Sequence, residues 1–209
     1  MNELNRIPEL HIDRLNELLD VSWRIYKSQF IDTRHPTYTE APFQHHLANI
    51  ISSVGQLYCC SRHDIFHVDL ETKVDGIQGK SKFVDITCEF VGTKASCAIE
   101  LKFKTEKQAA QNNGRIDAYT DIEALEQLCV NRFSMGRFYM ITDSAIYTKE
   151  STRGVGTVFA THHGAIISPG KDYSYPQSVG RKEVVTSYFK RHVFDWEYSS
   201  GWSFLEMQL

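Results

Sequence analysis

Charged residues stand in the middle of two otherwise apolar strands, and this feature constrains the fold more than any other. The two predicted strands contain residues 83–87 and 98–102. Side chains alternate along a strand with a period of two, so Glu100 and Lys102 project from one face and their apolar neighbours from the other. Burial of a carboxylate and an ammonium costs free energy unless each has a partner. The pattern therefore predicts a functional site on an antiparallel hairpin.

The turn between these strands predicts their register. Gly92-Thr93 is typical of a two-residue hairpin turn, and the register that it sets places Asp85 opposite Glu100. Facing carboxylates repel each other unless a cation lies between them. Mg²⁺ prefers such oxygen ligands, with Mn²⁺ as an alternative. Lys102 would then orient or deprotonate a water molecule, or offset charge on a phosphate. The other interpretation is an ordinary Glu–Lys pair on an exposed strand edge.

The order Asp85, then Glu100-Leu101-Lys102, resembles the catalytic signature of the PD-(D/E)XK nuclease superfamily. The similar region covers residues 39–143. The resemblance implies an α/β fold of the restriction-endonuclease-like type, with a mixed central sheet flanked by helices. It also implies that Asp85 and Glu100 bind Mg²⁺, with the Leu101 carbonyl as an extra ligand, and that Lys102 assists attack of water on a phosphodiester. Val84 stands where the family signature has proline.

A second acidic residue lies at a predicted helix start. Thr39 is a typical N-cap, and Glu40 and Pro42 fall within the first turn. Apolar residues then recur at spacings of three and four as far as Val54, which places Glu40 beside the core-facing stripe. In the similar nucleases an acid on this helix points toward the metal site, so Glu40 is predicted as an outer or second-metal ligand. Alternatively, Glu40 only stabilises the helix dipole.

The remaining pattern predicts alternating helices and strands, which is typical of an α/β fold. Helices are expected over residues 9–30 and 115–131, strands over 65–72, 137–143, 157–160 and 184–189, and a loop over 105–114. The whole chain is predicted to be one nuclease-like domain, with an N-terminal helix and linker (1–38), a catalytic core (39–143) and a β-rich C-terminal extension (144–209). The aromatic residues of that extension would form core, substrate contacts or a homodimer surface.

Composition excludes several classes of protein. Apolar residues make up 42% of the chain and charged residues 23%, as in soluble globular proteins. No run of eighteen apolar residues predicts a membrane span, and the N-terminus lacks the pattern of a secretory signal. Five cysteines do not form an even disulfide framework. The expected compartment is the cytoplasm.

Nucleic acid, most simply DNA, is the expected partner despite a net charge of −3. Local basic residues can contact phosphates, and four are predicted to do so: Lys82, Lys104, Lys107 and Arg115. Two acids on the same predicted helix, Asp117 and Asp121, are expected on its solvated face. The predicted function is that of a metal-dependent endonuclease. The alternatives are a non-catalytic nucleic-acid-binding or assembly protein on the same fold, and a structural partner whose hairpin charges face solvent.

Overall fold

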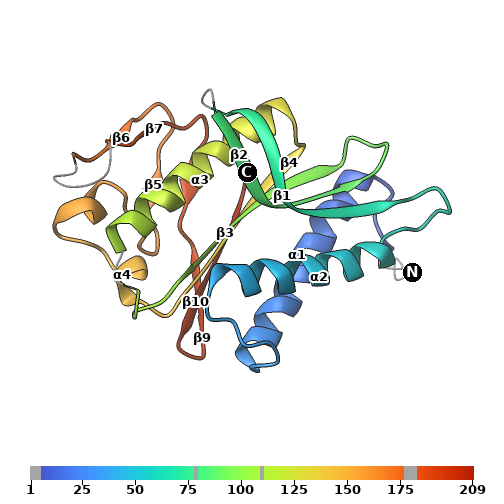
Figure 1. Cartoon of the computed structure of the whole chain (residues 1–209), viewed down its shortest axis with the longest axis horizontal. Helices are drawn as coiled ribbons and strands as arrows, with labels where there is room; N and C mark the ends of the chain where they lie inside the picture. The colour runs from blue at the N-terminus through green and yellow to red at the C-terminus, as the bar shows by residue number, and fades with distance from the viewer. Residues whose placement is uncertain (1–5, 78–79, 109–110, 177–182) are drawn as a thin grey trace, which may run out of the picture. The chain divides into compact units, whose positions relative to one another are not determined.

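The computed structural model describes residues 6–77, 80–108, 111–176 and 183–209. The central sheet is built from six strands: β1 (Phe66–Ile77), β2 (Lys80–Phe90), β3 (Ser96–Lys104), β4 (Met135–Thr142), β9 (Trp196–Ser199) and β10 (Trp202–Gln208). Their order is β1-β2-β3-β4-β10-β9, and the sheet is mixed (Figure 1). The predicted α/β class with a mixed sheet and helices is confirmed.

The other elements are helices and short strand pairs. The helices are α1 (His11–Ile31), α2 (Glu40–Leu57), α3 (Gln111–Asn131), α4 (Ala145–Thr148) and the 3-10 helix η1 (Gly154–Thr157). The short pairs join β5 (Ile166–Ile167) to β8 (His192–Val193) and β6 (Tyr173–Ser174) to β7 (Val185–Thr186). Within the described ranges, no helix has the length and apolar character needed to cross a membrane.

The chain divides into two compact units. The first unit contains residues 1–99 and 132–135, and the second contains residues 100–131 and 136–209. The boundary falls within β3, so Ile99 belongs to the first unit and Glu100 to the second.

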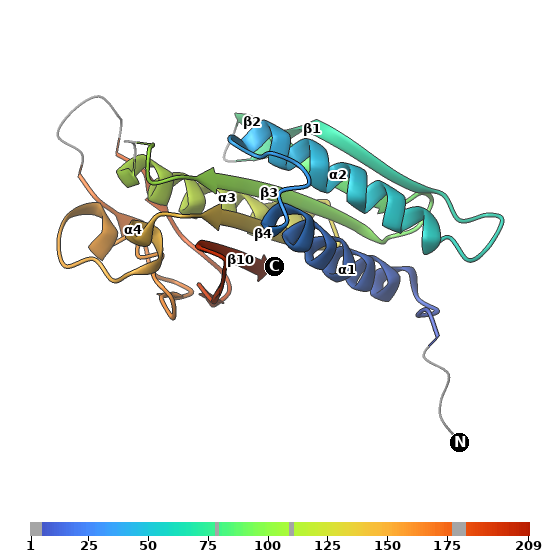
Figure 2. The ribbon, with the colours of Figure 1, turned by 90° about the horizontal axis from the view of Figure 1, so that it is seen from below.

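In the first unit, α1 packs against α2, and both helices lie against the β1–β2 pair (Figure 2). The strands bury alternate side chains, among them Phe66 of β1 and Ile86 and Phe90 of β2, as expected from the period of two. A Cβ atom at Gly55 of α2 would lie 2.1 Å from the Phe66 ring. Only glycine therefore allows this close approach of helix and strand.

The β2–β3 hairpin has the predicted register. Ile86 pairs with Ile99 and Cys88 pairs with Cys97. The turn differs from the predicted two-residue type, because the Thr93 N–H donates to the Phe90 carbonyl and Gly92 lies third in this turn with a φ of 76°. Glycine tolerates this positive φ without strain, so Gly92 suits the third position of the observed turn as well as the first loop position of the predicted one.

The second unit corrects three element predictions. Helix α3 begins at Gln111, so the predicted loop over residues 105–114 is too long. The predicted strand over 157–160 is wrong, because Thr157 is the last residue of η1 and no described strand covers residues 158–160. The predicted strand over 184–189 shrinks to β7. A short apolar run can be a buried loop as well as a strand, and here the glycines beside it favour a tight turn.

Asp64 connects the start of β1 to α1 in the first unit. Its carboxylate accepts hydrogen bonds from the backbone N–H groups of Ser61 (2.9 Å) and Cys60 (2.8 Å). It also contacts His11 Nε2 at 3.2 Å and the Arg14 guanidinium at 2.9 Å. The Ser61 N–H and the His11 side chain, with the other donors, lower the pKa of Asp64 to about 2.

We expect Asp64→Asn to lose stability only where the carboxylate is ionised. The folded pKa lies below the unfolded value of about 3.9, so the stabilisation is present above pH 4 and disappears as the pH falls through about 2. Urea unfolding followed by tryptophan fluorescence should show a lower midpoint for the variant at pH 6 and equal midpoints near pH 2. Asp172→Asn, at an exposed loop residue, is the control. A difference that does not change with pH would contradict the prediction.

Candidate active site

Glu100 and Lys102 lie inside the protein rather than on its surface. Glu100 is 3% exposed and Lys102 is 8% exposed. Their neighbours in sequence, Leu101 and Phe103, are also buried. Strand β3 lies between β2 and β4, so it is not an edge strand. The alternative of a solvent-facing Glu–Lys pair on a strand edge is therefore wrong for these two residues.

Lys102 has a carboxylate partner on α3. Its Nζ atom lies 2.6 Å from Asp121 Oδ2 and donates to the Leu101 carbonyl at 2.9 Å. The predicted solvated position of Asp121 is wrong, since the residue is buried, whereas Asp117 is half-buried. Asp121 belongs to the same helical stripe as the buried residues Ala118, Ile122 and Leu125. This spacing of three and four was the available signal for its burial.

Arg115, a predicted nucleic-acid contact, is buried in the second unit. Its guanidinium donates to the carbonyls of Ile146, Gly156 (3.4 Å) and Phe159 (3.3 Å) and to Ser151 Oγ (2.9 Å). Burial lowers its pKa. The Arg115 guanidinium donates to these internal acceptors and is buried, so the prediction that Arg115 contacts a phosphate is wrong.

The other three predicted phosphate contacts are more accessible. Lys82 on β2 and Lys104 at the end of β3 are half-buried, and Lys107 is exposed in the loop that follows β3. Their long side chains can keep the ammonium in water while the stem packs on the protein. Their role in binding phosphates stays a prediction.

Asp85 lies half-buried on β2 in the first unit, beside the start of α2. The Gln44 side-chain amide donates to the Asp85 carbonyl and to Glu71 Oε1, both at 2.7 Å. Gln44 follows Glu40 by four residues, which is about one turn of α2, so the two residues lie on the same side of the helix. Glu40 itself is half-buried. Its predicted role as a metal ligand stays a prediction.

The sequence did not indicate the role of Glu71. This residue has a φ of 51° although it lies within β1. The pairs Leu70–Ile86 and Thr72–Val84 place it opposite Asp85. A non-glycine residue in this conformation costs about 1–2 kcal/mol, and such strain concentrates at functional sites.

The donors suit a hard divalent cation without a preformed cage. Among the residues that the structure describes, no three His, Cys, Asp or Glu side chains are grouped so as to hold a metal ion. Mg²⁺ commonly binds through one or two carboxylates, waters and substrate phosphates. Asp85 and Glu100 are the carboxylates predicted for this role, and that role stays a prediction. The Leu101 carbonyl accepts a hydrogen bond from Lys102 Nζ at 2.9 Å. Its predicted role as an extra ligand stays a prediction.

Comparisons with family models, with curated proteins and with solved structures found no match to this chain. The function is therefore inferred from the chemistry of the residues described above.

Proposed function

We propose that this chain is a Mg²⁺-dependent endonuclease that hydrolyses phosphodiester bonds in DNA, similar in mechanism to the PD-(D/E)XK nucleases. The observation that supports this most is the buried charged group Glu100, Lys102 and Asp121 in the second unit. A buried ion pair is weak evidence for stability, because apolar residues of similar volume often stabilise a protein as well or better. Its presence on an apolar strand is better explained by a chemical role.

Asp85 and Glu100 are the proposed metal ligands, with Glu40 in an outer position. A bound Mg²⁺ would polarise the phosphate and lower the pKa of a water molecule. The Asp121 carboxylate lies 2.6 Å from Lys102 Nζ and pairs with it, so it holds the Lys102 side chain in one position. Lys102 would orient the water and offset negative charge on the phosphate.

The test is cleavage of end-labelled single-stranded DNA, duplex DNA and RNA in Mg²⁺, Mn²⁺ or EDTA. We expect the wild type to cleave DNA with either metal and not in EDTA. The double variant Asp85→Asn/Glu100→Gln, purified identically, should be inactive and so exclude a contaminating nuclease. The matched control is Asp75→Asn, which changes an exposed acid of β1 bonded to Ser81.

Two outcomes would overturn the proposal. One is equal cleavage by the wild type and the double variant, which would assign the activity to a contaminant. The other is absence of wild-type cleavage on every substrate, which would favour the non-catalytic nucleic-acid-binding protein on the same fold.

A further inference from the structure

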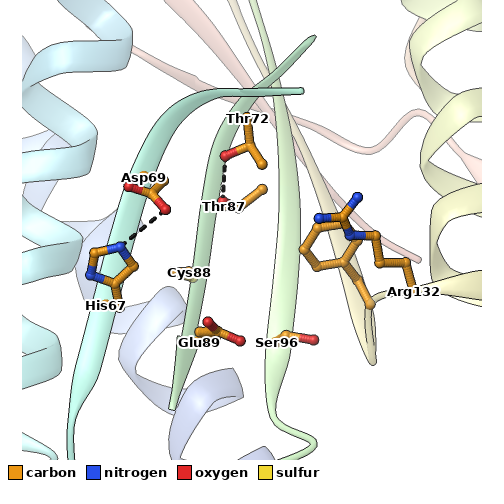
Figure 3. Close-up of a pocket in the computed structure, with 9 residues that line it drawn as sticks. His67, Asp69, Thr72, Thr87, Cys88, Glu89, Ser96 and Arg132 are labelled. Atoms are coloured by element: carbon orange, nitrogen blue, oxygen red, sulfur yellow. Dashed lines mark hydrogen bonds and ion pairs between the residues drawn. The ribbon is translucent and has the colours of Figure 1, made fainter. Parts of the chain in front are cut away.

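The first unit has a polar cavity on the side of β2 opposite the buried stripe that packs on the helices (Figure 3). Its volume is about 170 Å³. The side chains that matter here come from β1, β2, β3 and the turn after α3: His67, Asp69, Thr87, Glu89, Ser96 and Arg132. No activity proposed above uses these residues.

The strained Glu71 shapes the wall of this cavity. Thr72 pairs with Val84, a core residue, so regular alternation would place Thr72 on the helix-covered face. Instead, Thr72 Oγ1 lies 2.7 Å from Thr87 Oγ1 at the cavity (Figure 3). The unusual backbone of Glu71 thus accompanies a change of face by the next residue. The cavity wall is formed at a conformational cost, as is common at binding sites.

The lining combines hydrogen-bond acceptors with a cation. Asp69 lies 3.0 Å from His67 Nε2, and the Glu89 carboxylate is exposed beside them. Carboxylates repel phosphate but accept hydrogen bonds from amino groups of bases, such as N4 of cytosine. Arg132 lies on the other side of the cavity in Figure 3, with its guanidinium 5.6 Å from the centre of the Phe133 ring. This arrangement complements a ligand with an amino group at one end and an anion at the other.

We propose that this cavity is a nucleotide subsite that accepts a base with an exocyclic amino group, such as cytosine, with the amino group at Asp69 and Glu89 and a phosphate at Arg132. Thr87 lies two residues from Asp85 on the same face of β2, about 7 Å along the strand. This equals about two nucleotide steps of a B-form strand. The inference rests on the proposed nuclease function, because it assigns the bound nucleotide to the DNA strand that passes Asp85.

The test uses the intact protein in EDTA, so that no cleavage occurs. Titration with dCMP, dTMP and inorganic phosphate is followed by ¹⁵N-edited NMR. We expect dCMP to shift the amide signals of Thr87 and Glu89 and to bind at least about fivefold more tightly than dTMP, which lacks the amino group. Glu89→Gln and Asp69→Asn should each weaken dCMP binding by at least about fivefold. Asp75→Asn, outside the cavity on the same strand, should not.

The inference would be overturned by no shift with dCMP, by equal affinity for dCMP and dTMP, or by dCMP affinity unchanged in both carboxylate variants. Binding of inorganic phosphate alone would also overturn it, since the base would then contribute nothing. The assay is independent of hydrolysis. Selective dCMP binding by a protein that cleaves no DNA would support the subsite and contradict the proposed nuclease function. Cleavage of DNA without selective dCMP binding would support the nuclease function and contradict the subsite.

Discussion

Lys102→Ala should lower the rate of DNA cleavage by about a hundredfold or more while changing DNA affinity by less than about threefold. The ammonium of Lys102 would act mainly on charge that develops in the transition state, and loss of one such group typically has this effect. Several other lysines share the ground-state attraction to phosphates. Single-turnover cleavage in Mg²⁺ and a gel shift in Ca²⁺, which often supports binding without cleavage, measure the two quantities separately.

The matched control for this experiment is Lys104→Ala. Lys104 lies two residues along β3 on the same face as Lys102 but is less buried. It should weaken binding modestly and leave the single-turnover rate nearly unchanged. Equal losses of rate in the two variants, or a wild-type rate in Lys102→Ala, would remove Lys102 from the mechanism.

Lys102→Ala also leaves the Asp121 carboxylate buried without its ammonium partner, and a fold defect could then be mistaken for a catalytic one. Loss of one partner of a buried ion pair can cost about 3–5 kcal/mol. The double variant Lys102→Ala/Asp121→Ala removes both charges and should regain part of that stability in urea unfolding. Its cleavage rate should nevertheless stay low, because the ammonium is still missing.

The hairpin could be predicted from the sequence because its determinants are local. Alternation of charged and apolar residues gives the two faces, and a turn within four residues gives the register that pairs Ile86 with Ile99. The helix that begins at Glu40 has equally local signals. Burial of Asp121 could also have been predicted from its spacing with Ile122 and Leu125, since the helical period does not depend on whether a residue is charged.

The residues that contact Asp85 could not be predicted from the sequence, because these contacts join segments that are distant along the chain. Gln44 reaches Asp85 across forty-one residues of sequence, and nothing in its own neighbourhood indicates this partner. The positive φ of Glu71 is equally invisible, since glutamate is not a residue that favours it. The C-terminal strand β10 pairs with β4, which a local pattern near residue 204 does not reveal.

Glu126→Ala should destabilise the second unit by about 3–5 kcal/mol, because this buried carboxylate holds the segment that leads to β8. It accepts hydrogen bonds from the N–H groups of Phe189 (2.8 Å) and Lys190 (3.0 Å) and contacts His192 Nε2 at 2.5 Å. Alanine leaves all three donors without this acceptor, and the loss is most costly at His192, whose ring is buried. Urea unfolding measures the loss of free energy of unfolding in this variant. The control is Glu150→Ala, at an exposed position of the same unit.

Hydrogen exchange distinguishes the local cause from a general loss of stability. If Glu126 fastens the segment, the Phe189 and Lys190 amides should exchange faster in Glu126→Ala even under conditions where β4 remains protected, because local opening then requires less free energy than global unfolding. Glu126→Gln should have a smaller effect, since its amide oxygen can still accept from one or both backbone donors. Unchanged protection of both amides would mean that aromatic packing, including the contact between Tyr119 and Tyr188, holds this segment without the carboxylate.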